Sequence, residues 1–378
     1  MRANVTIREI SSSRDKKAFV RYLWDVYRAD PNWVPPLVMD RLKLIDEEKN
    51  PFYQHAQAKW FVAEENGKVV GRIGAIINDV HNKLHEERTG WFGFFECRHS
   101  QEIANALFAK AEEWLQAQGM ERVLGPANPS SNDEFGLLVD GFDRPPVMLM
   151  PYNPQFYSEL IERAGYQKEK DLYAYLISQK TSRTPKLERV VRALQERSRV
   201  TVRAFDPKHF DRDVALIKDL YNHFWEKNWG FVPFSDAEID YMAKDLKQIY
   251  DPDVVLFAER DGQTIGFSLS LPDINQAFAA GKRIPKGVMN LPIGVFSLMS
   301  HKKHIDTLRI MVLGVLPELR GRGIDGLLYW ETMERALKKG YMFGEASWVL
   351  EDNEPMNRAA ALMQGERYKT YRIYAKQL

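Results

Sequence analysis

The sequence lacks three things: cysteine in pairs, net charge, and long apolar runs. Its 378 residues contain a single cysteine, Cys97, so no internal disulfide or multi-thiol zinc site can form. Lys and Arg number 53 against 52 Asp and Glu, so no overall positive field attracts nucleic acid. The longest uncharged apolar stretch, residues 287–301, contains Pro292 and is shorter than the ~20 residues of a spanning helix. With no signal peptide at the N-terminus, we expect a cytoplasmic protein without transmembrane segments.

What is present is an ordinary globular composition with alternating strand and helix patterns. Apolar alternation, helical periodicity and hairpin turns at Asn66-Gly67 and Asp261-Gly262 predict an α/β fold with a mixed α+β sheet. The predicted strands are 5–10, 60–63, 69–77, 90–96, 200–205, 254–259, 264–270, 308–315, 345–350 and 368–375. The predicted helices are 16–27, 103–118, 186–197, 213–225 and 324–339, with Gly119 and Gly340 as C-terminal stops.

The order of elements repeats, which indicates an internal duplication. The segment from Phe61 to Gly71 (FVAEENGKVVG) matches the segment from Leu256 to Gly266 (LFAERDGQTIG) at the same point in each half. The polar stretch 179–185 is the predicted boundary. We therefore predict two tandem domains, residues 1–180 and 186–378.

The most informative segment links a predicted strand to a predicted helix. It reads Val-Leu-Pro-Glu-Leu-Arg-Gly-Arg-Gly-Ile from Val315 to Ile324. Glycines let a phosphate approach the backbone, and the first turn of the helix presents unpaired N–H groups to it. The spacing matches neither a Walker loop nor a dinucleotide fingerprint, and a plain surface turn is the alternative.

In this context the loop resembles the acyl-CoA loop of the GNAT acyltransferase superfamily. The resemblance implies that Arg320, Gly321, Arg322, Gly323 and Ile324 hold the CoA pyrophosphate. It also implies that the backbone of Leu313, Gly314 and Val315 bonds the pantetheine arm. Asp325 departs from the family pattern, because Gly or Ala is usual there. In the first half, residues 97–102 contain no glycine, so we expect that copy to lack a working CoA loop.

Further segments resemble a tandem GNAT group of bacteria that includes bacterial ceramide synthases. They are Asp30–Pro36, Asn50–Phe52, Gly125–Ser130, Asn132–Glu134, Tyr152–Pro154 and Lys369–Tyr374. The resemblance implies an N-acyltransferase that moves an acyl group, long-chain in the ceramide synthases, from acyl-CoA to an amine such as a sphingoid base. The alternatives are an aminoacyl-tRNA-dependent transferase and a non-catalytic CoA-binding scaffold. No metal and no nucleic acid are expected.

The second half offers three candidates for catalysis. Acyl transfer to an amine needs a base, and the leaving thiolate needs a proton. Glu345 is the first candidate base, and its alternative role is an ion pair with Arg309. Tyr371 is the candidate acid, or an ordinary strand aromatic. Asn353 bonds the pantetheine or orders a turn.

Two further regions have open roles. Asn128, Asn132, Asp133 and Glu134 form a dense polar loop, which binds the polar head of an acceptor or only fixes the loop itself. Residues 277–304 mix apolar and cationic side chains, a pattern typical of an acyl channel, a membrane contact at the inner face, or core packing. The sequence leaves the oligomeric state open.

Overall fold

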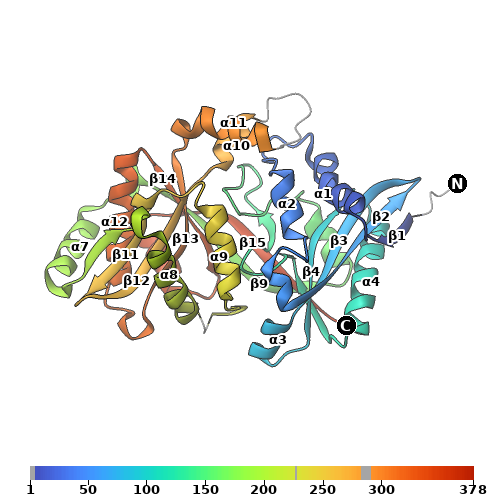
Figure 1. Cartoon of the computed structure of the whole chain (residues 1–378), viewed down its shortest axis with the longest axis horizontal. Helices are drawn as coiled ribbons and strands as arrows, with labels where there is room; N and C mark the ends of the chain where they lie inside the picture. Colours follow the sequence, from blue (N-terminus) through green and yellow to red (C-terminus); the bar gives the residue numbers. More distant parts are fainter. Residues whose placement is uncertain (1–4, 226–227, 282–290) are drawn as a thin grey trace. The chain divides into compact units, whose positions relative to one another are not determined.

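The computed structural model describes residues 5–225, 228–281 and 291–378, which form two compact units. The first unit comprises Met1–Asp171, Ala277–His301 and Thr370–Leu378, and the second comprises Leu172–Gln276 and Lys302–Lys369. Both are mixed α/β layers, as the sequence predicts (Figure 1).

The first unit is built on strands in the order β1-β2-β3-β4-β5-β15. Neighbours are antiparallel except β4 and β5, which are parallel. The strands are β1 (Val5–Glu9), β2 (Ala56–Glu65), β3 (Lys68–Asn78), β4 (Thr89–Cys97), β5 (Arg122–Gly125), β8 (Leu137–Asp140), which pairs with β15 (Glu366–Gln377), and the small pair β6 (Ala127–Asn128) and β7 (Glu134–Phe135). The helices are α1 (Ser13–Tyr27), α2 (Val38–Leu44), η1 (Pro51–Gln54), α3 (Asp79–His85), α4 (Gln101–Ala117), α5 (Tyr157–Arg163) and α11 (Leu291–His301).

Helix α4 covers one face of this sheet. Its apolar positions, including Leu107, Phe108 and Leu115, pack against the inward residues of β2, β3 and β4. On the opposite face, Phe19 of α1 contacts Trp60 and Phe94 edge-on or tilted. The period-2 and period-3.6 patterns therefore produce the layers expected of them.

The second unit has the strand order β9-β14-β13-β12-β11-β10, with β13 and β14 parallel and the other pairs antiparallel. The strands are β9 (Gln167–Ser178), β10 (Thr201–Ala204), β11 (Val255–Arg260), β12 (Gln263–Pro272), β13 (Thr307–Val315) and β14 (Phe343–Leu350). The helices are α6 (Gln179–Ser182), α7 (Pro185–Ser198), η2 (Pro207–His209), α8 (Phe210–Trp225), α9 (Asp236–Leu246), η3 (Pro252–Val254), η4 (Lys302–His304), η5 (Pro317–Leu319), α12 (Ile324–Lys339) and α13 (Glu354–Leu362). Helix α10 (Asn275–Gly281) begins in this unit, but its residues from Ala277 onward belong to the first.

Alternation along β11 separates two cores in this unit. Leu256 and Ala258 face α7 and α12, whereas Val255 and Phe257 face α8. The sheet is thus covered on both sides, and the β13–α12 connection runs along the first of these cores.

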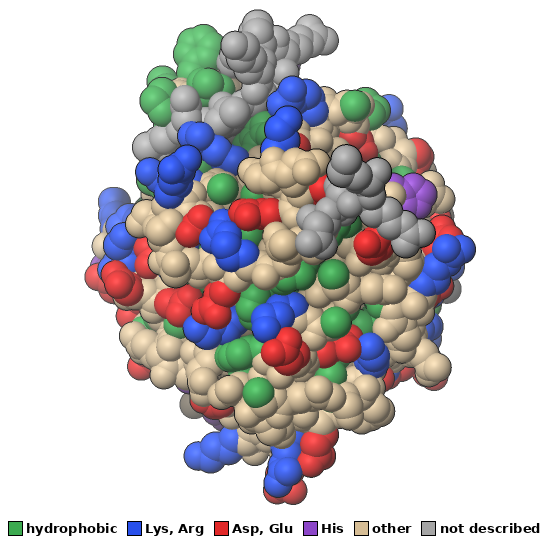
Figure 2. Space-filling model, turned by 90° about the vertical axis from the view of Figure 1, so that its right-hand side faces the viewer, with side chains coloured by type: hydrophobic (Ala, Val, Ile, Leu, Met, Phe, Trp, Pro, Cys, Tyr) green, Lys and Arg blue, Asp and Glu red, His purple; other side chains and the backbone are tan. Residues whose placement is uncertain are grey.

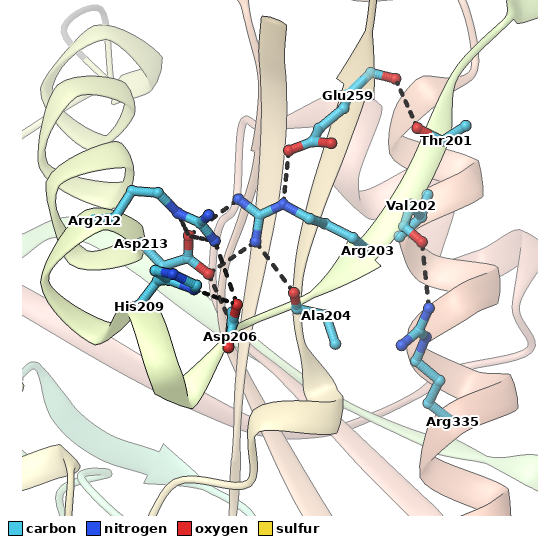
Figure 3. Close-up of polar contacts among 10 residues, drawn as sticks. All are labelled: Thr201, Val202, Arg203, Ala204, Asp206, His209, Arg212, Asp213, Glu259 and Arg335. Atoms are coloured by element: carbon cyan, nitrogen blue, oxygen red, sulfur yellow. Dashed lines mark hydrogen bonds and ion pairs between the residues drawn. The ribbon is translucent and has the colours of Figure 1, made fainter. Parts of the chain in front are cut away.

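A network of ion pairs fastens the outer edge of this unit (Figure 3). The guanidinium of Arg203 on β10 donates to Asp213 at 2.8 Å and to Glu259 at 2.6 Å. Burial alone would raise the pKa of Asp213, but hydrogen bonds from Arg203 and from the Asp206 backbone hold it below its usual value. These acids are bound within the scaffold, and we assign them a structural role.

Two strands are divided between the units. Residues 172–178 of β9 pair with β14 in the second unit, and residues 370–377 of β15 pair with β8 and β5 in the first. Each unit therefore contains the strand that ends the other sequence copy. The predicted boundary between the two copies, at residues 179–185, stays a prediction.

Every strand and helix predicted from the sequence is present, with ends shifted by a few residues. The sequence did not predict bounds for the strands β5, β6, β7, β8 and β9, or for the helices α2, α3, α5, α6, α9, α10, α11 and α13, and several of these elements are short. Within residues 5–225, 228–281 and 291–378, no helix is long and apolar enough to cross a bilayer.

Candidate active site

Two parallel strands of the second unit pair at one end and part at the other. The register between β13 and β14 runs from Thr307↔Phe343 to Ile310↔Ala346 and stops there. β13 nevertheless continues to Val315, still paired with β12 on its other side. Beyond Ile310, in the described part of the chain, the edge of β13 that faces away from β12 makes no ladder with β14. Backbone N–H and C=O groups along such an edge can bond an extended ligand that carries amides.

The predicted phosphate loop follows this edge directly. Gly323 is the N-cap of α12 with φ of +80°, and Gly321 has φ of +74°, values that favour glycine. Within the described residues no side chain caps α12, so its first-turn N–H groups remain available to an anion. A Cβ at Gly323 would lie 2.7 Å from Leu194 of α7, so the loop is also packed closely.

The two arginines of the loop differ in their surroundings. Arg322 is exposed and, within the described chain, makes no hydrogen bond or ion pair. Arg320 donates to the backbone carbonyl of Phe224 at the end of α8. A side chain at Gly314 would collide with that same Phe224, so packing against α8 already explains this glycine. The structure thus places all eight predicted CoA residues on one strand, loop and helix, but their contact with CoA remains a prediction.

Glu345 lies on β14 directly opposite Arg309 of β13, in the last paired part of the two strands. Its side chain is fully buried. The Ser347 hydroxyl donates to one carboxylate oxygen at 2.6 Å, as expected for residues on one face of a strand, and the Tyr368 hydroxyl donates to the other.

The electrostatic environment of Glu345 favours proton exchange near neutrality. Burial raises its pKa to about 6, although the Ser347 hydrogen bond and the charges of Arg309 and Lys369 act in the opposite direction. Arg309 and Lys369 are only 2% and 1% exposed, so both cations are held inside the protein. A carboxyl group with this pKa is suited to act as a general base at physiological pH.

Neither Tyr368 nor Lys369 was predicted as a catalytic residue, although Lys369 begins one of the segments that carry the family resemblance. Both lie on the final strand, β15, and a Tyr-Lys pair is an ordinary sequence within a strand. Only strand pairing in the folded chain places the Tyr368 hydroxyl on Glu345, so no local signal could have found them.

The other two catalytic candidates occupy different surroundings. Asn353 is the N-cap of α13, and its side chain accepts from the Met356 backbone at 3.3 Å. Tyr371 is fully buried and lies opposite Leu138 in the first unit, whereas Glu345 belongs to the second. The turn-ordering role of Asn353 is therefore visible, and the acid role of Tyr371 stays a prediction.

The polar loop of the first unit is bonded internally. Asn128 accepts from the Phe94 backbone at 2.6 Å and donates to Glu134 at 3.3 Å, and Arg41 binds Glu134 through both guanidinium nitrogens. Burial would raise the pKa of Glu134, but Arg41 holds it below its usual value. Ser130 donates to Asp133 at 2.6 Å and accepts from the Asn132 backbone. These contacts fix the loop, and acceptor binding by the four residues stays a prediction.

Cys97 is buried, and burial raises the pKa of its thiol to about 12, so it is a poor nucleophile. Across the described ranges no group of three or more His, Cys, Asp or Glu side chains is placed to hold a metal ion.

Comparison with known proteins identifies the class and then the family. The model of the acetyltransferase (GNAT) family matches residues 20–133, in the half where the sequence analysis recognised only the order of elements. A tandem GNAT protein from the clavulanic acid biosynthesis pathway has the same fold, with a TM-score of 0.58 and 12% identity over 99% of this chain and 98% of that one. The fold of this chain is thus that of a tandem GNAT protein.

Two curated relatives span the whole chain. The bacterial ceramide synthase of Caulobacter vibrioides is 36% identical over 100% of this chain and 98% of its own length. Protein YghO of Escherichia coli is 34% identical over 98% of this chain and 95% of its own. The chain belongs to the GNAT superfamily, in the tandem bacterial group that includes bacterial ceramide synthase. The family implies acyl-CoA as the donor and an amine as the acceptor.

Proposed function

We propose that this protein transfers a long-chain acyl group from acyl-CoA to the amine of a sphingoid base. The observation that carries the proposal is the 36% identity, over the full length, to a relative named bacterial ceramide synthase. The parted edge of β13, followed by an uncapped helix N-terminus, supports a donor site in the second unit. We also propose that the reaction takes place in the cytoplasm.

In the proposed reaction Glu345 is the base. The amine nitrogen attacks the thioester carbonyl, the C–N bond forms, and Glu345 accepts the proton that the nitrogen loses. The C–S bond then breaks, and the thiolate takes up the proton from Glu345, which leaves free CoA as the thiol and returns the carboxylate to its ionised form. Arg309 and Lys369 stabilise the ionised carboxylate before the attack.

The binding test is a calorimetric titration of the full chain with CoA, acetyl-CoA and palmitoyl-CoA. We expect palmitoyl-CoA to bind at least roughly tenfold more tightly than acetyl-CoA, because its chain transfers from water into the protein. Arg322→Glu should weaken all three by roughly tenfold or more, because it reverses a charge beside the phosphates. Lys338→Glu, at the far end of α12, is the matched control.

The activity test mixes palmitoyl-CoA with sphinganine or with spermidine, a polar amine without a long chain. Amide product is followed by mass spectrometry and free CoA by thiol release. We expect amide from sphinganine and little from spermidine. Binding of palmitoyl-CoA with no amide from either amine would refute the sphingoid acceptor. No binding of any CoA species would refute the donor and favour the aminoacyl-tRNA alternative.

A further inference from the structure

Helix α11 exposes three of its large apolar side chains, whereas two of its small residues, Gly294 and Ser297, are buried. Val295, Phe296 and Met299 are 47%, 67% and 77% exposed. They occupy positions i, i+1 and i+4 and so form one stripe along the helix. A helix of a globular protein ordinarily has the opposite arrangement, with its apolar stripe against the core.

The inner face of α11 explains how the helix is held in this orientation. Ser297 is buried and donates to the Ala277 carbonyl at 2.5 Å. Gly294 is packed so tightly against Leu37 that a Cβ there would collide with it. Small residues thus allow α11 to contact the rest of the first unit closely, while the outer stripe stays largely exposed.

The stripe is unusual on this surface. Seven large hydrophobic residues are exposed in the described part of the chain, and three of them fall within these five positions. Figure 2 shows acidic and basic side chains interspersed over most of one face, with hydrophobic side chains gathered at its top. Helix α11 lies at the top of Figure 1. Grouped exposed apolar side chains of this kind mark an interaction surface.

The charge around the stripe points to the partner. Residues 274–305 contain no Asp or Glu and five Lys or Arg, whereas the average of the chain would put about four acids in such a stretch. Lys302 and Lys303 follow α11 directly and are exposed. Lys282, Arg283 and Lys286 belong to the same stretch and lie outside the described residues, as does most of the apolar part predicted before residue 291.

We propose that α11 rests on the surface of a membrane that contains anionic lipid, with its apolar stripe among the acyl chains and the lysines at the headgroups. Apolar side chains flanked by cations are the composition of an interfacial helix. A second copy of this chain fits less well, because a twofold contact would bring the same acid-free segments together. The inference extends the proposed function, since both proposed substrates carry long chains that reside in membranes.

Flotation of the full chain with vesicles tests the proposal. Vesicles of phosphatidylcholine alone are compared with vesicles that also contain phosphatidylglycerol. We expect binding to the anionic vesicles that falls as salt is raised. Phe296→Ser/Met299→Ser should abolish it, and Lys302→Glu/Lys303→Glu should weaken it by at least 30-fold, since each lysine contributes about 1 kcal/mol.

Two matched variants control for hydrophobicity and charge. Leu362→Ser removes another exposed apolar side chain, and Lys180→Glu/Lys208→Glu makes the same charge change elsewhere. Both should bind like the wild type. Equal binding by the α11 variants, or no binding by the wild type, overturns the proposal. A dimer in solution that Phe296→Ser dissociates also overturns it, in favour of a contact between copies.

The readout separates this proposal from the proposed function. Vesicle binding needs no turnover, and amide formation can be measured with detergent-dispersed sphinganine. A protein that makes the amide but ignores vesicles refutes only the membrane contact. One that binds vesicles but makes no amide refutes only the function.

Discussion

Both units contain a strand, a loop and a helix in the same order, yet the N-termini of the two helices are capped differently. In the first unit β4 leads into α4, whose N-cap is Ser100, and the Ser100 hydroxyl accepts from the Ile103 backbone at 3.4 Å. In the second unit β13 leads into α12, whose N-cap is Gly323, with no side-chain cap in the described chain. The N-terminus of α4 is thus capped by the Ser100 side chain, whereas the N-terminus of α12 is available to a phosphate.

The region beyond the last paired residues of the parallel strands also differs from what the second unit shows for β13 and β14. In the first unit the parallel register of β4 and β5 ends at Trp91↔Leu124. Beyond it, the Asn128 side chain bonds the Phe94 backbone, and Gly93 packs so closely on the Ala127 carbonyl that no Cβ fits. The chain thus fills this gap with its own β6 segment. The comparison teaches that one order of elements can leave a helix start without a side-chain cap or fill the space beside it with the chain itself, depending on a few residues at the strand end.

The largest expected effect tests which unit carries the base. Glu345→Gln should lower kcat/KM for amide formation by ~10²–10⁴-fold, because an amide accepts no proton at neutral pH. The acyl-CoA Kd should change little. Glu96→Gln, which alters a buried carboxylate of the first unit, should leave kcat/KM within about threefold. Thermal unfolding of both variants checks that they fold.

The pH dependence belongs to the same test. The pKa of Glu345 is raised to about 6, and the base must be ionised, so kcat/KM should fall as pH drops through 6. The fall should be absent from the residual activity of Glu345→Gln. An unchanged rate in Glu345→Gln, or an equal loss in Glu96→Gln, would place the base elsewhere.

The next largest effect concerns Asn128, whose side chain lies beyond the last paired residues of β4 and β5. Asn128→Ala should lower the free energy of unfolding by roughly 2–3 kcal/mol, because the Phe94 N–H and a Glu134 oxygen lose a partner in the interior. Chemical denaturation measures this, with the exposed Asn105→Ala as control. A neutral Asn128→Ala would show that water or another group already satisfies the gap.

A smaller effect follows from the carboxylate of Glu96. It accepts from Tyr27 and Tyr157, both at 2.8 Å, and burial raises its pKa to about 7 despite nearby Arg72. The native state therefore binds a proton on Glu96 more tightly than the unfolded state does. The stability that this protonation contributes is fully present below about pH 4.5 and is lost as pH rises through 7. Between pH 5 and 8 the wild type should lose about 2 kcal/mol relative to Glu96→Gln, as measured by urea unfolding at each pH. Parallel pH curves for the two proteins would contradict the shift.

The smallest effect comes from the helix cap. Ser100→Ala should cost about 1 kcal/mol of stability and leave the acyl-CoA Kd unchanged, because α4 is not the proposed donor site. If Ser100→Ala alters acyl-CoA affinity, the first unit takes part in donor binding and the contrast between the units fails.

Much of the fold was accessible from the sequence because its signals are local. Apolar alternation and hairpin turns predicted ten of the strands in the described chain but not β5, β6, β7, β8 and β9. The glycines at 119 and 340 predicted where two long helices end: Gly340 is the C-cap of α12, and Gly119 follows the C-cap of α4. The loop from Arg320 to Gly323 was recognisable because a positive φ favours glycine. The short helices were missed because their few residues carry little periodicity.

Only part of the candidate site could be predicted from the sequence. Glu345 and Ser347 share a face by alternation, which a strand guarantees. Tyr368 reaches Glu345 from a strand 23 residues away in the chain, and Lys369 is buried although lysine is ordinarily exposed. Pairing between distant strands decides such contacts, and no local pattern records it.

By itself, the sequence determined the family, the duplicated order of elements and the glycine-rich loop, because each depends on residue types at short spacing. The tertiary structure decided where each pair of parallel strands separates, which unit receives each final strand, and which face of α11 meets solvent. Those outcomes depend on side chains and backbones that folding brings together from distant segments. Local residue types do not determine how much space these segments leave between them.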